Sequence, residues 1–587
     1  MSIAAIAMLG LCGGSQALGQ AYTWNTVSGG SWNQNSNWTP STSFPNGFND
    51  TATIQQDISG PTTINLNAAT MLNRLTLGDS VGTSPYTIAP NGGSLTFRAT
   101  QNLAVDSSYI TSSNGANVIT APIAMDNTFA RIANTGGGSL TLSSISSVRG
   151  GGYRFLDNNT KVLPGGGMTS VNGIGNVFAI NTSLGSGIQS WTTYDSVTGA
   201  VGALPLASYG TLAASNSTTN VTQANSATLS ANTTMNSFRW TTANASTLGL
   251  GANDMTIISG GILRSAAPNH RTEFTTTGGK IITPTGVPLT VWQNSSNQMT
   301  FSAPIQVDGM NLYGRIIFNT SASSSTFGTG DINIFGGGYS TSFVYAPTLS
   351  NNVNISNADG SSLSFTPTAP GTMTLSGTVT VNGVLTGNAN GAYSIRTLAG
   401  YGSSSVTPIT VTTNLAPGDG GTGTLDLANN LTLAAASIYK VQLGGTTPGD
   451  GKGFYDQVNM TSATGAITLN TGAALDFSLA DGFAPTPADN FFIMTRADTS
   501  SWGNYFLGTT EGGFVTFGDG LNNYTGQITY QANWIGTQLG SALTGGNDVA
   551  FYNIQGPTPV PEPASAVTVL ALFSSGVLNR RKRAMRH

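Results

Sequence analysis

Residues Met373-Thr374-Leu375-Ser376-Gly377-Thr378-Val379-Thr380-Val381 alternate apolar side chains with hydroxyl-bearing ones on both sides of a glycine. A period of two places the apolar side chains on one face of an extended chain, which is typical of a β-strand with one buried face. The same short pattern recurs at Leu75-Thr76-Leu77, Leu95-Thr96-Phe97, Leu140-Thr141-Leu142, Met255-Thr256-Ile257-Ile258 and Leu289-Thr290-Val291. The sequence therefore predicts a protein built from many short strands.

Glycine-rich segments separate these strands and let the chain turn at low steric cost, as at Asn91-Gly92-Gly93, Gly136-Gly137-Gly138 and Gly336-Gly337-Gly338. Leu75 and Leu95 are 20 residues apart, about one coil of a parallel β-helix, although the spacing is uneven elsewhere. We therefore predict an all-β protein whose body, residues 65–414, is a right-handed parallel β-helix, or β-solenoid, with irregular coils. The alternative is a string of β-sandwich domains, but no Pro-rich linkers divide this range.

Charged residues make up only 7% of the 587-residue chain, against about 25% in a typical globular protein, while 39% of residues are hydrophobic. The hydrophobic content is enough for a core and argues against general disorder. The net charge is −4, and residues 556–587 hold five of the 20 basic and one of the 24 acidic residues. The remainder, with 15 basic and 23 acidic residues, has a net charge of −8. This balance disfavours nucleic acid as a partner because no basic stripe remains to neutralise phosphates.

The N-terminal residues predict a secretory signal peptide over residues 1–20. An apolar run at positions 3–11 precedes small residues at Ala17-Leu18-Gly19, which indicates cleavage near Gly19 or Ala21. The single cysteine, Cys12, lies in this segment, so we expect a mature chain without disulfides or thiolate metal sites. Lipid attachment at Cys12 is the alternative, but Leu11 stands where that modification requires a small residue.

Three tryptophans follow the signal segment, at Trp24, Trp32 and Trp38. We predict that residues 21–64 form a cap in which these rings cover the open end of the β structure. Stacking of the rings on carbohydrate is the alternative. The tryptophan-rich turns, with the strand Asp50-Thr51-Ala52-Thr53-Ile54 after them, resemble the opening of large exported autotransporter-like proteins.

A second β-rich module is predicted over residues 415–555. Its landmarks are a turn at Pro417-Gly418, strands at Gly423-Thr424-Leu425 and Asp456-Gln457-Val458, and a closing strand at Gly545-Gly546-Asn547-Asp548-Val549. This order resembles the C-terminal end of autotransporter-like passenger regions. The resemblance implies a β-rich module that caps the solenoid, and it implies nothing about catalysis.

The C-terminal residues 556–587 combine three elements in a fixed order. Val560, Pro561, Glu562 and Pro563 precede an apolar run from Ala564 to Leu578, and the basic cluster Arg580, Arg581, Lys582 and Arg583 follows. The order resembles the PEP-CTERM sorting tail of exported bacterial proteins, in which Val-Pro-Glu-Pro is recognised by an exosortase. The resemblance implies a single transmembrane helix at about 564–579, although 15 residues give roughly 22 Å, short of the ~30 Å hydrocarbon core. Basic side chains that reach the lipid surface can close this gap. An amphipathic helix packed on the body is the alternative.

Groupings suited to catalysis or metal binding are scarce in the sequence. Histidine occurs only at His270 and His587, which disfavours a Ser-His-Asp triad or a two-histidine metal site. Gly418-Asp419-Gly420-Gly421-Thr422-Gly423 fits a dinucleotide-binding pattern, but Pro417 precedes it and a strand follows, so we predict a turn. The polar cluster at residues 268–273 is expected to be an exposed turn, and Asp450 and Asp548 are expected to be turn residues, with calcium ligation as the alternative.

We therefore predict no catalytic residue, no cofactor and no metal site. The expected function is that of an exported, surface-associated structural or adhesive protein, anchored first in the cytoplasmic membrane and then released to the cell surface or extracellular matrix. Its expected partners are an exosortase-type enzyme, the membrane through the tail, and an extracellular polysaccharide. The alternative is a carbohydrate-active enzyme or a carbohydrate-binding protein on a β-helix, for which a groove that gathers carboxylates would be the sign.

Overall fold

The computed structural model describes residues 19–559 except positions 48, 99–107, 127, 150, 172–178, 182–188, 242–243, 266–269, 294–296, 320–324, 336–339, 346, 357–360, 406–407 and 519–521. The described chain is all-β, with parallel pairing in most of its sheets and three short 3₁₀ turns, η1 (Asn35–Asn37), η2 (Leu206–Ser208) and η3 (Leu212–Ala214). The all-β prediction is confirmed. The arrangement is compatible with a β-solenoid, and we call one passage of the chain around the sheets a coil.

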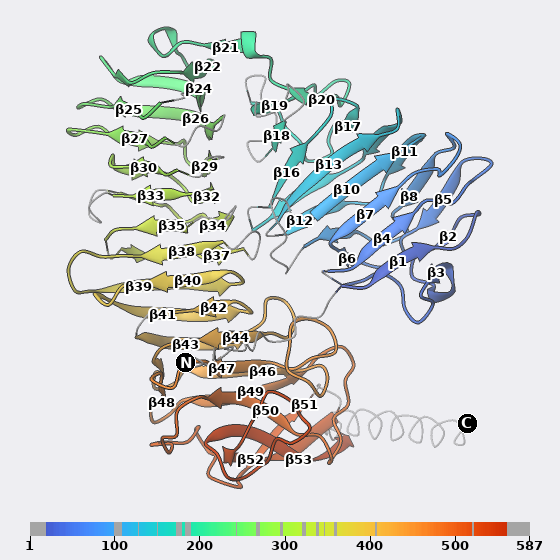
Figure 1. The fold of residues 1–587 in the computed structure, drawn as a ribbon, viewed down its shortest axis with the longest axis vertical. Helices are drawn as coiled ribbons and strands as arrows, with labels where there is room; N and C mark the ends of the chain where they lie inside the picture. Colours follow the sequence, from blue (N-terminus) through green and yellow to red (C-terminus); the bar gives the residue numbers. More distant parts are fainter. Residues whose placement is uncertain are drawn as a thin grey trace, which may run out of the picture.

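Two stacks of coils make up the molecule, and they lie side by side (Figure 1). The first stack has three sheets. The ten-stranded sheet contains β1 (Ala21–Trp24), β3 (Trp38–Thr39), β4 (Thr51–Ile54), β7 (Arg74–Leu77), β10 (Ser108–Ser113), β13 (Phe129–Thr135), β16 (Gly152–Phe155), β18 (Ala179–Asn181), β19 (Ser190–Tyr194) and β20 (Val201–Ala203). The six-stranded sheet contains β2 (Gly30–Ser31), β5 (Thr62–Asn65), β8 (Tyr86–Ala89), β11 (Ala116–Ile119), β14 (Ser139–Leu142) and β17 (Thr160–Val162). The four-stranded sheet contains β6 (Thr70–Leu72), β9 (Leu95–Phe97), β12 (Ile123–Asp126) and β15 (Ile145–Val148).

The second stack has two larger sheets. The 18-stranded sheet contains β21 (Tyr209–Gly210), β22 (Asn220–Gln223), β24 (Thr233–Trp240), β26 (Met255–Arg264), β28 (Ile281–Ile282), β29 (Leu289–Gln293), β31 (Ile305–Gln306), β32 (Met310–Tyr313), β34 (Ile332–Phe335), β36 (Thr348–Leu349), β37 (Val353–Ile355), β39 (Gly371–Val381), β41 (Gly391–Gly400), β43 (Ile409–Pro417), β45 (Leu431–Leu433), β46 (Ile438–Leu443), β48 (Ile467–Leu469) and β49 (Ala474–Leu479). The 15-stranded sheet contains β23 (Ala227–Thr228), β25 (Ser246–Gly249), β27 (Thr272–Thr275), β30 (Met299–Phe301), β33 (Ile316–Phe318), β35 (Ser340–Phe343), β38 (Ser362–Phe365), β40 (Val384–Gly387), β42 (Ser403–Ser404), β44 (Thr424–Leu427), β47 (Gln457–Met460), β50 (Phe491–Arg496), β51 (Phe514–Gly518), β52 (Asn522–Ala532) and β53 (Asp548–Pro559).

Strand β39 shows how the alternating pattern builds a coil. Met373, Leu375 and Val379 are almost fully buried, as the period of two predicts. The pairing register with β41 shifts between Leu375 and Thr378, and at Gly377 the chain passes so close to its neighbour that a Cβ would lie 2.2 Å from the carbonyl oxygen of Asn351. Its first half pairs with β36 and its second half with β37, so one long strand lies beside two short strands of the preceding coil.

The expected coil length of 20 residues between Leu75 and Leu95 is wrong, because the two residues lie in different sheets. Leu75 is the register partner of Ala52 and Ile110, whereas Leu95 is the partner of Thr70 and Ile123. Coils that pass through both sheets of the second stack vary in length from 16 residues between Tyr393 and Ile409 to 36 between Val458 and Met494. Loops of unequal length between short, regular strands account for this spread.

The predicted range 65–414 is shared between the two stacks, and two strands run across its limits. β5 crosses the predicted boundary at residue 65 and β43 crosses that at residue 415. Near the C-terminal end the pairing changes, because β50, β53, β52 and β51 join in antiparallel fashion. The predicted signal peptide and sorting tail lie outside the described residues. Within those residues, no helix is long and apolar enough to cross a membrane.

Part of the 18-stranded sheet has buried side chains on both of its sides. All described side chains of β29, β32, β34 and β37 are buried, although alternate ones point away from their own core. Trp292 and Tyr313 stack with ring centroids 3.8 Å apart, and Trp292 Nε1 donates to Gln189 Oε1 at 2.8 Å. These outward rings pack with Trp191 of the first stack, which explains how the stacks are held together.

Candidate functional site

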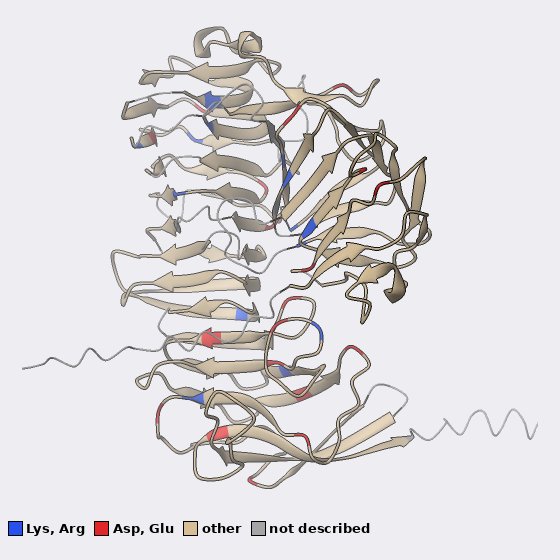
Figure 2. Ribbon diagram, turned by 45° about the vertical axis from the view of Figure 1, so that its right-hand side comes forward, with Lys and Arg blue, Asp and Glu red and all other residues tan. Residues whose placement is uncertain are grey.

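The inter-stack ion-pair cluster is composed of Arg98, Arg149, Asp126 and Asp419. Charged residues are sparse over the described chain (Figure 2). Arg98 follows β9 and Arg149 follows β15, so both arginines lie at one edge of the first stack. Asp419 lies in the turn after β43 of the second stack. Arg98 Nη2 lies 2.5 Å from Asp419 Oδ2, and Arg149 Nη1 bonds Asp419 Oδ1.

Asp126 completes this cluster from the first stack. Arg149 Nε donates to Asp126 Oδ1 at 2.8 Å, and Arg149 Nη2 donates to Oδ2 at 2.6 Å. Burial on its own would raise the pKa of Asp419, but attraction by Arg98 and Arg149 and a hydrogen bond from Asn382 lower it. Asp419 is therefore held as a carboxylate, and its role in this arrangement is to join the stacks.

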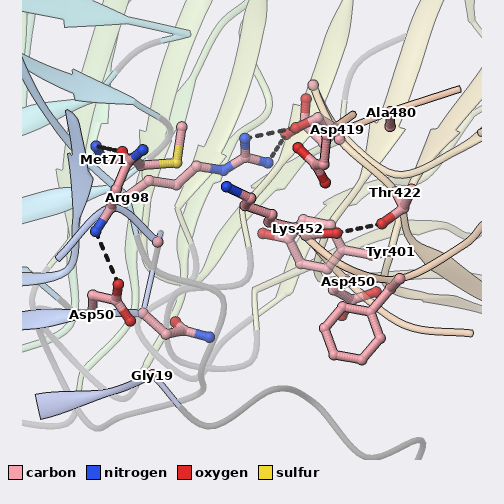
Figure 3. Close-up of a pocket in the computed structure, with 18 of the residues that line it drawn as sticks. Gly19, Asp50, Met71, Arg98, Tyr401, Asp419, Thr422, Asp450, Lys452 and Ala480 are labelled. Atoms are coloured by element: carbon pink, nitrogen blue, oxygen red, sulfur yellow. Dashed lines mark hydrogen bonds and ion pairs between the residues drawn. The ribbon is translucent and has the colours of Figure 1, made fainter. Parts of the chain in front are cut away.

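A cleft of about 680 Å³ opens beside the cluster, between the two stacks (Figure 3). The first stack contributes residues of β1 and of the loop before β4, and the second contributes the turns after β43, β46 and β49. The side chains that line it include the aromatic residues Tyr22, Phe44, Tyr401 and Phe454 and the polar residues Asp50, Arg98, Asp419, Gln442, Asp450, Lys452 and Asp481. A cleft of this size, with aromatic faces and a few polar groups, has the general form of a small-molecule or oligomer site.

Asp450 is the most deeply buried unpaired carboxyl group at the cleft, with 7% of its surface exposed. Its Oδ1 accepts a hydrogen bond from the Thr424 backbone N–H at 2.9 Å. Burial raises the pKa of Asp450 to about 7; the Thr424 bond opposes this rise and repulsion by Asp426 adds to it. Near neutral pH this group is therefore shared between its acid and carboxylate forms.

The first-stack wall of the cleft is fixed by hydrogen bonds. Asp50 accepts backbone N–H groups of Gln20 at 2.9 Å and Asn46 at 3.0 Å. The hydroxyl groups of Tyr22 and Ser43 lie 2.6 Å apart. On the opposite wall, the ring of Phe454 lies against Gly449, where a Cβ would come within 2.6 Å of it. These hydrogen bonds and this close contact therefore fix the shape of both walls of the cleft.

The N-terminal tryptophans are not at a surface. Trp24, Trp32 and Trp38 have no exposed surface, and Trp38 packs edge-on against both other rings. Trp38 Nε1 donates to the carbonyl oxygen of Trp32 at 2.7 Å. This burial favours the capping interpretation and leaves no free ring face on which a sugar could stack.

His270, Glu273 and Glu511 do not line the cleft. His270 is exposed, and Glu273 pairs with Arg271 at 3.0 Å. Glu511 accepts hydrogen bonds from Thr529 and from the Tyr530 backbone. Within the described ranges, no three His, Cys, Asp or Glu side chains lie close enough together to hold a metal ion.

The turn prediction for residues 418–423 is confirmed, since Gly418 and Gly420 have positive φ angles of 88° and 74°. What the sequence did not indicate is that Asp419, between these glycines, meets Arg98 from 321 residues away. The sorting residues Val560, Pro561, Glu562 and Pro563 and the basic cluster Arg580–Arg583 lie outside the described residues. No protein-family model matches the chain, and no curated protein matches it.

Proposed function

We propose that this chain is an exported, surface-associated structural or adhesive protein that is sorted through its C-terminal residues. The observation that carries the proposal is the order of elements after residue 555, in which Val560-Pro561-Glu562-Pro563, an apolar run and a basic cluster follow one another. An apolar run suits insertion in a membrane, and a basic cluster suits retention on the cytoplasmic side. An exosortase-type enzyme is the proposed processing partner.

The described body supports a non-enzymatic role. The cleft does gather carboxylates, which would be expected of a carbohydrate-active enzyme, but two of these carboxylates have other partners. Asp419 is neutralised by Arg98 and Arg149, and Asp50 accepts backbone hydrogen bonds. The acidic cleft therefore favours binding of a ligand, and carbohydrate binding is the second candidate function.

Variants of the tail test the sorting proposal in the native cells. We expect Glu562→Ala to leave full-length precursor in the membrane, because recognition is lost while the apolar run survives. We expect neutral residues at 580–583 to release uncut protein, because little else fixes the orientation of so short a span. Fractionation, with mass determination of the mature termini, measures both outcomes. If both variants reach the surface in the parental amount and at the parental mass, the tail is not a sorting signal.

A further inference from the structure

We propose that the cleft between the two stacks binds an amino-sugar segment of a polysaccharide, with the Asp450 carboxyl group accepting the sugar ammonium and the Phe44 and Phe454 rings contacting sugar faces. This inference gives the proposed adhesive role a ligand and rests on that role for its biological setting.

Asp450 is the carboxyl group of the cleft that is available to a ligand. Oδ1 is engaged by the Thr424 backbone, but no described residue donates a hydrogen bond to Oδ2. The side chain is more than nine-tenths buried, and it lines the cleft. Oδ2 is therefore available to a donor or a cation that enters the cleft.

The charge of the cleft decides the class of ligand. Arg98 and Asp419 neutralise one another, which leaves Asp50, Asp450 and Asp481 against the single base Lys452. This excess of acid repels uronate-containing polysaccharides and attracts ammonium groups. Calcium fits less well, because it takes six to eight oxygen ligands and no group of three acidic ligands exists among the described residues.

The aromatic residues indicate a sugar rather than an isolated amine. Phe44 and Phe454 come from opposite stacks, and both rings are partly exposed in the cleft. Gln442 also lines the cleft, and its side-chain amide makes no hydrogen bond with another described residue. Aromatic faces cover the apolar faces of pyranose rings, while amide and carboxyl groups bind their hydroxyls.

Binding should release a proton from Asp450. The charged and titratable groups around it are Asp426, Asp456, Arg98 and Tyr401. A sugar ammonium placed at Oδ2 would favour the carboxylate form and so discharge the proton that the buried group partly holds at pH 7. Calorimetry in buffers of different ionisation enthalpy measures the net number of protons exchanged, and the difference between the parent and Asp450→Asn gives the share released by Asp450.

The test is calorimetric titration of the full-length protein at pH 7 with hexamers of glucosamine, N-acetylglucosamine and galacturonic acid. We expect the glucosamine hexamer to bind about tenfold more tightly than the acetylated one, and the galacturonate hexamer not to bind. Asp450→Asn should weaken glucosamine binding about tenfold and abolish proton release, while binding of the acetylated hexamer changes less than about twofold. Phe454→Leu, which keeps an apolar side chain but removes the ring, should weaken both neutral and amino-sugar binding.

Asp489→Asn is the matched control, because Asp489 lies in an exposed turn outside the cleft and should leave all titrations unchanged. Circular dichroism of each variant establishes that it is folded. The proposal is overturned if no hexamer binds below about 10 mM, if galacturonate binds most tightly, or if folded Asp450→Asn binds glucosamine as the parent does. Because binding is measured on purified protein and sorting is measured in cells, failure of one proposal is distinguishable from failure of the other.

Discussion

The buried carboxyl group of Asp450 predicts that the protein loses stability as the pH rises. Its folded pKa of about 7 lies above the ordinary value of 3.8, so between these values the folded state binds more protons than the unfolded state. The stabilisation from this group is present at low pH and is lost as pH rises toward 7. Each pKa unit corresponds to about 1.4 kcal/mol, so a change from pH 5 to pH 9 should remove roughly 2–3 kcal/mol.

The substitution Asp450→Asn isolates this contribution, because an amide keeps the shape and can still accept the Thr424 N–H through Oδ1. The variant should lose less stability than the parent between pH 5 and pH 9, by roughly 2–3 kcal/mol. Asp426 and Asp456 also have pKa values raised by burial, and both groups remain in the variant. Urea unfolding monitored by tryptophan fluorescence at both pH values measures the difference.

Asp308→Asn provides the control for this experiment. The pKa of Asp308 is lowered by backbone hydrogen bonds from Thr329, Gly330 and Gly286, so its carboxylate is ionised in both states from pH 5 to pH 9. That variant should shift the unfolding midpoint equally at both pH values. If Asp450→Asn shows the same pH dependence as the parent, Asp450 is not protonated in the folded protein, and the argument from its burial is wrong.

Three further predictions concern stability and processing. Asp419→Ala should lower the stability of the contact between the stacks by about 3–5 kcal/mol, because it removes the carboxylate that Arg98 and Arg149 share, and small-angle scattering should show a larger radius of gyration. Trp38→Ala should cost about 3–5 kcal/mol by leaving a cavity in the N-terminal cap, whereas Phe514→Ala, at a ring that is 64% exposed, should change the unfolding midpoint little. Glu562→Ala should accumulate as membrane-bound precursor, measured by fractionation, and its presence at the surface at the parental mass would argue against sorting.

The strands and their buried faces could be predicted because each depends on a few neighbouring residues. Met373, Leu375 and Val379 show the period-two pattern, and all three are buried. The contact between the two stacks is also indicated by the sequence. Trp292 and Tyr313 each follow an inward apolar residue, so an aromatic side chain stands at an outward position in successive coils. An outward aromatic repeated in this way indicates a second layer that covers the sheet.

The cleft and its ion pairs could not be predicted in the same way. Arg98 and Asp419 are 321 residues apart, and each stands beside a strand as an ordinary turn residue would. Asp450 lies in a glycine-rich loop typical of an exposed turn, and only the packing of the loop against neighbouring coils buries it. Because coil lengths range from 16 to 36 residues, the sequence has no regular period from which such neighbours could have been inferred.

Arg98 and Arg149 lie far from Asp419 in the sequence, so their contacts with it form late in folding. During synthesis, Arg98 and Arg149 emerge long before Asp419, and contacts so remote in sequence form late. Asp126 emerges between the two arginines and binds Arg149 through both carboxylate oxygens. The first stack thus carries one counter-ion of its own, which offsets half of the charge of the two arginines until the second stack has grown far enough to place Asp419 beside them.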